Sequence, residues 1–287
     1  MSDAATSLPD GVTLLDHLGG PAVRVETPTS SAIIQLDGAH VASFVPAGGR
    51  DILWMSPRTK AGEGSAIRGG VPLVGPWFGP GRDGRTTPKH GWFRTSRWQL
   101  DEATVDADAA RLVLGLRGAD PSGHGITASL VVEVGAHLRM ALTVTAVDAP
   151  LELECAFHGY LAVGDVRRCA IDGLGGAHYL DNMDDLTRKL QTDDTLRLVE
   201  ETDRVYEVTG PVQVHDELLG RTLEARPEGS TRTVVWNPWA ATTAGIADMP
   251  DESWTGFVCV EQAIAKDGFI ALTAGESHTL STTFSVR

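Results

Sequence analysis

The stretch HLRMALTVTAV, residues 137–147, decides the class of fold. Every second position holds an apolar residue, and these positions are Leu138, Met140, Leu142, Val144 and Ala146. Because successive side chains of a strand point to opposite faces, this alternation predicts a strand with one buried and one solvated face. The same period recurs over residues 111–117 and 126–134 and predicts two further strands of this kind.

Shorter strand-like runs occupy much of the remaining chain, at residues 22–26, 32–36, 41–45, 231–236, 257–260 and 279–286. No window carries a sustained helical stripe of apolar residues, so helix is expected only as single turns near residues 184–189 and 251–254. No linker or low-complexity tract divides the chain. The sequence therefore predicts an all-β protein in which residues 1–287 form one large antiparallel β-sandwich domain with little helix.

The composition is typical of a soluble globular protein, with 287 residues of which 42% are hydrophobic and 22% charged. The net charge of −14 argues against nucleic acid and against an anionic membrane as partners. No apolar run is long enough to span a bilayer and residues 1–4 do not resemble a signal peptide, so a cytoplasmic location is expected. Cys155, Cys169 and Cys259 are odd in number and widely spaced, which predicts reduced core thiols.

Basic residues gather between residues 58 and 97, where eight basic groups stand against the acidic Glu63 and Asp83. The basic groups are Arg58, Lys60, Arg68, Arg82, Arg85, Lys89, Arg94 and Arg97. This segment is therefore +6, and the rest of the chain is −20. A local anion site and a solvated basic loop both explain such a cluster. The stretch 56–95 is also rich in Gly and Pro and too long for an idle hairpin loop, which indicates a functional segment.

Several common catalytic motifs are missing from the sequence. The closest two of the nine histidines are His124 and His137, so no local His-x-His or His-Glu-x-x-His metal site exists. Residues 79–84 spell G-x-G-x-x-G, but the following RTTP cannot open the long helix that a dinucleotide site needs. Without a phosphate loop or a serine nucleophile elbow, nucleotide-dependent and serine-hydrolase chemistry lose support.

His158 lies outside the predicted core stripe of its strand. Over residues 151–161 the apolar side chains share one face, and the polar side chains on the other face are Glu152, Glu154, His158 and Tyr160. A histidine at such a position is either solvated or functional, and the strand alone leaves both interpretations open.

Glu261 directly follows residues 257–260, a run in which apolar residues occupy both faces. A carboxylate beside such a run is costly unless it is paired or bound to a ligand. A structural ion pair and a functional role both remain open for this residue.

Seven blocks, in this order along the chain, resemble those of a known enzyme family. They are RGGVP at 68–72, PWFG at 76–79, PKHGWFR at 88–94, HGY at 158–160, TDRVY at 202–206, VWNPW at 235–239 and VCVE at 258–261. The chain thereby resembles the hexose-6-phosphate mutarotases, also called glucose-6-phosphate 1-epimerases, which belong to the wider aldose 1-epimerase superfamily.

The resemblance implies a β-supersandwich of the galactose mutarotase type and an isomerase that interconverts the α and β anomers of a sugar phosphate. Glucose 6-phosphate is the expected substrate, and neither a metal nor another cofactor is implied. The resemblance assigns six site residues, namely the acid His158, the base Glu261, the sugar-binding His90 and Asp203, and the phosphate ligands Arg68 and Arg94. The phosphate assignment agrees with the separately found +6 segment, because arginine forks suit a phosphate monoester.

In this chemistry, protonated His158 gives a proton to the ring oxygen while the Glu261 carboxylate takes one from the anomeric hydroxyl. Glu152 and Glu154 would help to keep His158 charged if they lie near it, and burial should raise the pKa of Glu261. Three tryptophans could offer either an apolar face for the sugar or core packing: Trp77, Trp236 and Trp239.

Three positions bear on substrate preference. Gly159 stands where the family commonly has Thr, which could alter a hydrogen bond at the site. Trp92 and Phe93 stand where Phe and Ala are common, which could reshape the pocket. Lys89 is expected to face solvent rather than to bind the phosphate.

Three rival functions remain beside the mutarotase. The first is a non-catalytic sugar-phosphate binding protein, which would not need both His158 and Glu261. The second is an epimerase of unphosphorylated aldoses, which the +6 segment disfavours. The third is a glycoside hydrolase, which needs two carboxylates where this constellation supplies one carboxylate and one histidine. The expected partner is a small-molecule sugar phosphate. The sequence leaves the oligomeric state open, and a monomer is one of the alternatives.

Overall fold

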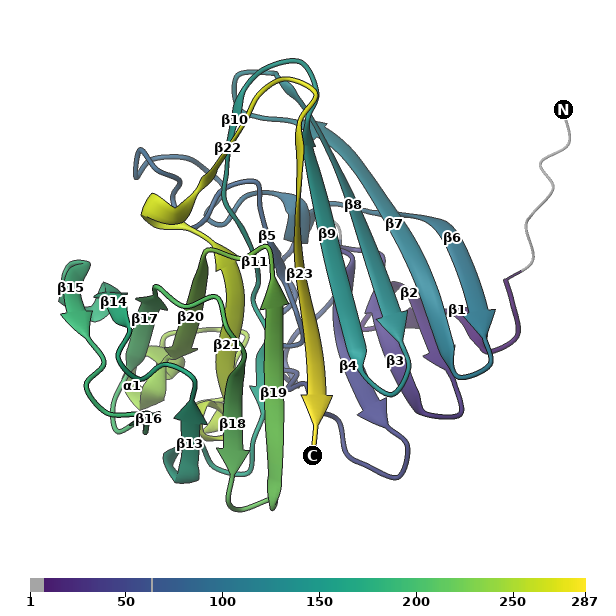
Figure 1. Ribbon diagram of the computed structural model, residues 1–287. Coiled ribbons are helices and arrows are strands. Elements are labelled where there is room, and N and C mark those ends of the chain that lie inside the picture. Colours follow the sequence, from purple (N-terminus) through teal and green to yellow (C-terminus); the bar gives the residue numbers. More distant parts are fainter. Residues whose placement is uncertain (1–7, 63) are drawn as a thin grey trace, which may run out of the picture.

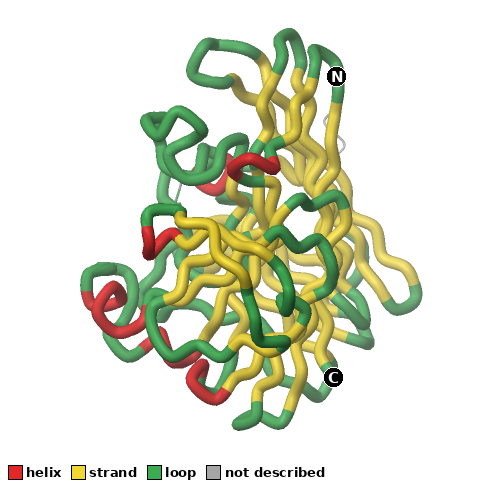
Figure 2. The backbone as a smooth tube through the Cα atoms, turned by 60° about the vertical axis from the view of Figure 1, so that its left-hand side comes forward, coloured by secondary structure: helices red, strands yellow, loops and turns green. Residues whose placement is uncertain are grey.

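The computed structural model describes residues 8–62 and 64–287, and antiparallel strands make up most of it (Figure 1). Helices are few and short among the strands (Figure 2). This architecture confirms the predicted all-β class. Residues 1–4, which bear on the signal peptide, and Glu63 of the basic segment lie outside the described residues. That the whole chain forms one domain stays a prediction.

A nine-stranded sheet forms one layer of the fold. Its strands in spatial order are β16 (Thr195–Leu196), β13 (Cys169–Asp172), β18 (Val212–Asp216), β19 (Arg221–Glu228), β23 (Ser277–Val286), β9 (Leu138–Ala146), β8 (Gly125–Val134), β7 (Ala109–Ala119) and β6 (Gln99–Asp106). The C-terminal strand β23 therefore lies in the middle of this sheet, between β19 and β9 (Figure 1).

An eight-stranded sheet forms the second layer. Its strands in order are β15 (Thr187–Leu190), β14 (His178–Asp181), β17 (Thr202–Tyr206), β20 (Arg232–Asn237), β21 (Phe257–Ile264), β11 (Cys155–Phe157) and β5 (Leu73–Val74), and β12 (Tyr160–Ala162) also pairs with β21. All eight residues of β21 are buried, because both of its faces are covered.

Two smaller sheets and six short helical segments complete the described structure. The sheets are β1 (Val12–His17), β2 (Gly20–Glu26), β3 (Ser30–Gln35) with β4 (His40–Pro46), and β10 (Leu151–Leu153) with β22 (Ile270–Leu272). The α-helix is α1 (Trp239–Ala244), and the 3-10 turns are η1 (Phe93–Thr95), η2 (Val166–Arg168), η3 (Asn182–Asp184), η4 (Ser253–Gly256) and η5 (Lys266–Gly268). Among the described residues, none of these helices has the length and apolar character needed to cross a membrane.

The alternating stretch that predicts the fold is strand β9. It pairs with β8 residue by residue, with Leu142 opposite Leu130. Its apolar side chains are buried, whereas the hydroxyl groups of Thr143 and Thr145 bond across to β23 on the other face. On the core side, β23 packs against β21 of the second sheet, which joins the two layers.

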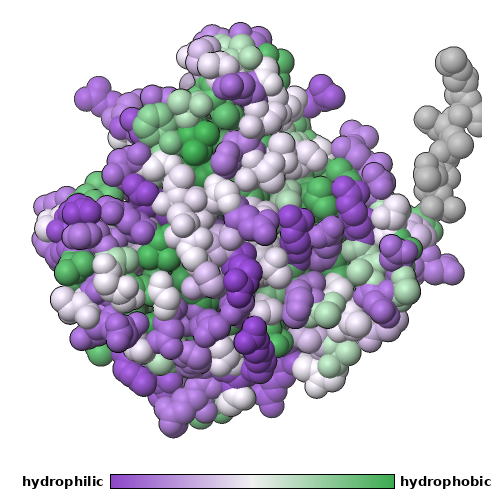
Figure 3. Space-filling model, in the orientation of Figure 1, coloured by the Kyte–Doolittle hydropathy of each residue, from purple (hydrophilic) through white to green (hydrophobic). Residues whose placement is uncertain are grey.

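The predicted cysteine state is confirmed, and one of the two predicted helical turns needs correction. Cys155, Cys169 and Cys259 are all free and buried. Residues 187–190 form strand β15 instead of a helical turn, because the left-handed Asp185 and Leu186 end the preceding turn. Near residues 251–254 the predicted single turn is confirmed, as the 3-10 turn η4. The surface in Figure 3 is mainly polar, with apolar residues in scattered groups.

Residues 151–161 do not form the single strand that the alternation predicts. They form three short strands, because β10 pairs with β22 while β11 and β12 pair with separate parts of β21. His158 and Gly159 lie in the gap between β11 and β12. This interruption places His158 opposite the middle of β21.

Candidate active site

The irregular stretch 56–95 lies against the strands that surround β21. Its short strand β5 pairs with β11, and isolated bridges join Val71 to Val41 and Gly69 to Met55. These backbone contacts hold residues 69–74 of the basic segment beside β4 and β11. The part of the predicted functional segment that forms these pairs therefore has a defined position in the fold.

His158 and Glu261 face each other in the interior. In the pairing with β21, Phe157 of β11 lies opposite Gln262 and Tyr160 of β12 lies opposite Cys259. The connection between β11 and β12, which contains His158, therefore lies opposite Glu261. The His158 Nε2 atom is 3.3 Å from the Glu261 Oε1 atom, and the side chains are 13% and 2% exposed. An imidazole and a carboxyl group are therefore brought together from positions more than one hundred residues apart in the chain.

Aromatic rings surround the imidazole of His158. The Tyr160 ring stacks nearly parallel to it with centroids 4.9 Å apart, and Trp236 meets it edge-on at 5.6 Å. The His90 ring lies 6.5 Å away in a T-shaped arrangement. Of the three tryptophans considered from the sequence, Trp236 is the one in contact with His158, while Trp239 stacks on Trp254.

Arg68 is held on two sides beside this cluster. Its Nε atom donates to the two carboxylate oxygens of Asp248, at 3.1 and 3.2 Å. Its Nη1 atom donates to the Tyr160 hydroxyl oxygen at 3.2 Å. The guanidinium is therefore oriented by an acid and by the ring that stacks on His158.

Arg94 is the second arginine of the cluster. Its Nη2 atom donates to the Lys89 carbonyl oxygen at 2.8 Å, while its Nε atom is buried without a hydrogen-bond partner among the described residues. Burial lowers the pKa of Arg94, and its charge lies close enough to lower the pKa of Glu261. A buried guanidinium N–H without a partner is unusual, and an anion would satisfy it.

His90 and Asp203 border the same space. The left-handed backbone at His90 (φ 69°) turns its Nδ1 atom to accept from the Gly79 N–H at 3.3 Å. Burial and four nearby cations, Arg94, Lys89, Lys266 and Arg68, lower the pKa of His90 to about 3. Asp203 on β17 accepts from the Asn182 amide at 2.6 Å, and burial raises its pKa.

Burial acts on the charged forms of both members of the His158–Glu261 pair. It lowers the pKa of His158, and the neighbouring His90, Arg94 and Arg68 lower it further. It raises the pKa of Glu261, as predicted, and Asp203 adds to this effect while Arg94 opposes it. The Glu261 Oε2 atom also lacks a hydrogen-bond partner among the described residues. His158 and Glu261 thus lie buried beside two arginines. The Arg94 Nε and Glu261 Oε2 atoms have no hydrogen-bond partner among the described residues.

Comparisons with known proteins show the family of this chain. The family model described as "Aldose 1-epimerase" matches residues 21–285. The chain belongs to the aldose 1-epimerase family. A relative from Escherichia coli (strain K12) named "Putative glucose-6-phosphate 1-epimerase" is 34% identical over 250 residues, covering 85% of this chain and 83% of the relative.

Solved structures of aldose 1-epimerase relatives share the fold. The crystal structure described as "a putative mutarotase (YeaD)" from Salmonella typhimurium has a TM-score of 0.89 at 29% identity and covers 98% of this chain and 95% of its own. A galactose 1-epimerase from Lactobacillus acidophilus NCFM has a TM-score of 0.76 at 13% identity over 98% of this chain and 99% of its own, which shows the fold alone. The predicted galactose mutarotase-like fold is confirmed.

Three residues of the site are missed by the sequence analysis. Asp248 holds Arg68, Asn182 holds Asp203, and Lys266 lies close enough to lower the pKa values of His90 and Asp203. No carboxylate pairs with Lys266 among the described residues. Its position five residues after Glu261, where the buried strand ends, is a signal that could have found it.

The expectation that Glu152 and Glu154 support the charge of His158 is not met. Glu152 is exposed and pairs with Arg82. Glu154 is buried, and its carboxylate accepts from the backbone N–H groups of Phe78 and Lys266, at 3.2 and 2.7 Å. Glu154 therefore fixes two loops at the rim of the site instead of contacting the imidazole.

The departures from the family pattern lie on the core side of the site. A Cβ on Gly159 would meet the Phe284 ring at 3.0 Å, so this position faces the nine-stranded sheet. Phe93 is fully buried and packs edge-on against Trp98, and Trp92 packs over Gly118. The structure therefore gives no contact through which these residues reshape the pocket.

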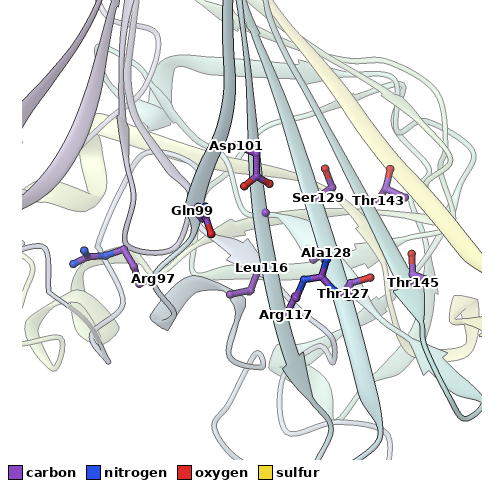
Figure 4. Close-up of a pocket in the computed structure, with 11 residues that line it drawn as sticks. Arg97, Gln99, Asp101, Leu116, Arg117, Thr127, Ala128, Ser129, Thr143 and Thr145 are labelled. Atoms are coloured by element: carbon purple, nitrogen blue, oxygen red, sulfur yellow. The ribbon is translucent and has the colours of Figure 1, made fainter. Parts of the chain in front are cut away.

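A separate hollow lies on the outer face of the nine-stranded sheet. It measures about 610 Å³ and is lined by polar side chains of β6 to β9, among them Asp101, Ser129 and Thr143 (Figure 4). None of the six predicted site residues lines it. Within residues 8–62 and 64–287, no group of three or more His, Cys, Asp and Glu is arranged to hold a metal ion.

Proposed function

We propose that this protein interconverts the α and β anomers of a hexose 6-phosphate, with glucose 6-phosphate as substrate. The observation that carries the proposal is the buried His158–Glu261 pair, 3.3 Å apart, beside Arg68 and the incompletely bonded Arg94. Membership of the aldose 1-epimerase family and the name of the Escherichia coli relative support the reaction and the substrate.

The proposed reaction moves two protons and needs no other reactant. The Glu261 carboxylate takes the proton of the C1 hydroxyl while the His158 imidazolium gives a proton to the ring oxygen, and the C1–ring oxygen bond breaks to leave an aldehyde. Rotation about the C1–C2 bond and reclosure with the reverse proton transfers give the other anomer. Both oxygens are bonded to C1, so an acid and a base that face each other at 3.3 Å can serve them together.

We assign the phosphate to Arg68 and Arg94 and the sugar hydroxyls to His90 and Asp203. The first assignment rests on the unpartnered Arg94 Nε atom and on the fixed guanidinium of Arg68. The second is supported by His90 staying neutral at physiological pH, since its pKa is lowered to about 3. A neutral imidazole can both donate and accept hydrogen bonds with hydroxyl groups.

The proposed setting is the cytoplasm, with the protein acting as a monomer on a small molecule. The three buried free thiols support a reducing compartment. The net charge of −14 favours a small anion bound at a local basic site over nucleic acid as the partner.

Magnetisation exchange between the two anomers, measured by NMR, tests the function. The wild-type protein should accelerate exchange for glucose 6-phosphate far more than for glucose, relative to protein-free buffer. Exchange at the buffer rate for glucose 6-phosphate and for other hexose 6-phosphates would contradict the proposal and leave a non-catalytic binding protein.

A further inference from the structure

A continuous chain of contacts runs from the proposed phosphate site to the proposed acid. The Arg68 Nη1 atom donates to the Tyr160 hydroxyl oxygen at 3.2 Å. The Tyr160 ring lies against the His158 ring at 4.9 Å with planes 15° apart. Both side chains are buried, so little water separates the guanidinium from the imidazole.

Two positive groups approach His158 from different elements of the fold. Arg68, which also pairs with Asp248, lies behind Tyr160, and Arg94 lies on the 3-10 turn η1. The nearby His90 is neutral at physiological pH, because its pKa is lowered to about 3. In a buried site each positive charge disfavours a second positive charge on the imidazole. The charges of the two arginines therefore oppose the protonated state that the acid needs.

The acidic neighbours lie on strands of the eight-stranded sheet. Glu261 of β21 is in contact with the His158 Nε2 atom, and Asp203 of β17 lies close enough to raise the pKa of Glu261. The remaining titratable neighbours are Tyr160 of β12 and the buried thiol of Cys259. Arg68 and Arg94 both lower the pKa of His158. Of these two arginines, Arg94 also lowers the pKa of Glu261. Neutralising both arginines therefore favours a proton on His158 more than it favours one on Glu261.

We propose that the phosphate group of the substrate is an activator as well as an anchor, because by neutralising Arg68 and Arg94 it lets His158 carry the proton that opens the sugar ring. This inference rests on the proposed function. It makes specificity for phosphorylated sugars a property of the chemical step in addition to binding. Free glucose would then react slowly even when it occupies the pocket.

Supplying the two halves of the substrate separately tests the proposal. Exchange between the anomers of glucose is measured with the wild-type protein, with and without inorganic phosphate, and the protein-free rate at each phosphate concentration is subtracted. Phosphate should raise the protein-catalysed rate at least about tenfold and in a saturable manner, since one unit of pKa changes the protonated fraction up to tenfold. A rate that is unchanged or falls with phosphate, while glucose 6-phosphate is turned over, would overturn the proposal.

Two substitutions show whether the effect arises at the proposed site. In Arg94→Met, inorganic phosphate should no longer accelerate glucose exchange. In Lys60→Met, which removes an exposed cation of the same basic segment, the activation should remain as in the wild type. Equal activation in both variants would place the phosphate elsewhere and contradict the mechanism.

A direct measurement of His158 gives a readout other than activity. The imidazole signals of His158, assigned with a His158→Gln variant, are followed by NMR at fixed pH while inorganic phosphate is added. They should move towards the imidazolium position as phosphate binds. Calorimetry gives the phosphate concentration at which binding is saturated. If the signals at that concentration still have the positions of a neutral imidazole, the proposal is overturned.

The outcomes separate this inference from the proposed function. If the protein turns over glucose 6-phosphate but inorganic phosphate does not accelerate anomer exchange of glucose, the proposed function stands and the activating role of the phosphate group is contradicted. Failure to turn over any hexose 6-phosphate removes the proposed function itself, whatever inorganic phosphate does to His158.

Discussion

The Nε2 atom of His158 lies 3.3 Å from the Oε1 atom of Glu261, and Tyr160 and Trp236 enclose the imidazole. This relationship supports a first prediction about Glu261→Gln. The amide keeps the shape of the side chain but cannot take a proton, so anomer exchange of glucose 6-phosphate should fall by about 100-fold to 10,000-fold. NMR exchange measures the rate, and calorimetry should show that sugar-phosphate binding is largely kept. Wild-type exchange rates in the variant would remove Glu261 from the mechanism.

The second prediction concerns the charge of Arg94. Arg94→Ala should weaken binding of glucose 6-phosphate by about 10-fold to 100-fold, because hydrogen bonds to charged groups contribute about 1.5–3 kcal/mol. Binding of glucose, compared by the same titration, should change far less. Equal losses for the two ligands would contradict a phosphate role for Arg94.

Lys266 is expected to add to the affinity for the phosphorylated substrate. Its backbone is held by the buried Glu154, and its charge lies among the groups that act on His90. Lys266→Met should raise the KM for glucose 6-phosphate by about threefold to tenfold, as expected for losing one partly solvated charge near an anion. Lys189→Met is the matched control, because Lys189 already pairs with Asp181. The same rise in KM in both variants would show that only the overall charge matters.

Gly159 is predicted to be fixed by packing against the second sheet. In Gly159→Ala the new methyl group would lie 3.0 Å from the Phe284 ring, and overpacking of this kind costs about 1–3 kcal/mol. Urea unfolding measures the loss, and adding Phe284→Leu should recover part of it. If the double variant loses as much free energy of unfolding as the two single variants together, the two positions are not in contact.

Buried His40 makes stability depend on pH. It is 1% exposed, and burial lowers its pKa to about 3 from 6.5. Between these values the unfolded chain binds the proton and the folded chain does not, so stability is lost as pH falls below about 6.5. The loss is about 1.4 kcal/mol per pH unit for each such histidine.

The His40 prediction is tested by urea unfolding at pH 7 and pH 5. His40→Gln should lose about 2 kcal/mol less than the wild type between these two values. His137→Gln removes an exposed histidine and should keep the wild-type dependence on pH. If all three proteins lose the same stability, His40 is not the source of the effect.

The fold class follows from the amino-acid sequence alone, because the signal for it is local. Alternation along residues 138–146 reports which face of a strand is buried, and no distant residue is needed to interpret it. The same local signal failed at residues 151–161, where partners on β21 and β22 divide one alternating run into three strands. Pairing between strands far apart in the chain leaves no trace in the alternation itself.

The family resemblance predicts six site residues, and the folded chain shows which other residues lie around them. Asp248 pairs with Arg68, and Lys266 lies close enough to His90 to lower its pKa, although both pairs are far apart in the sequence. Glu154, expected beside His158, instead fixes the backbone of Phe78 and Lys266. The physical reason is that burial and pairing depend on how loops pack over the sheet, and these set the charge states of His158 and Glu261.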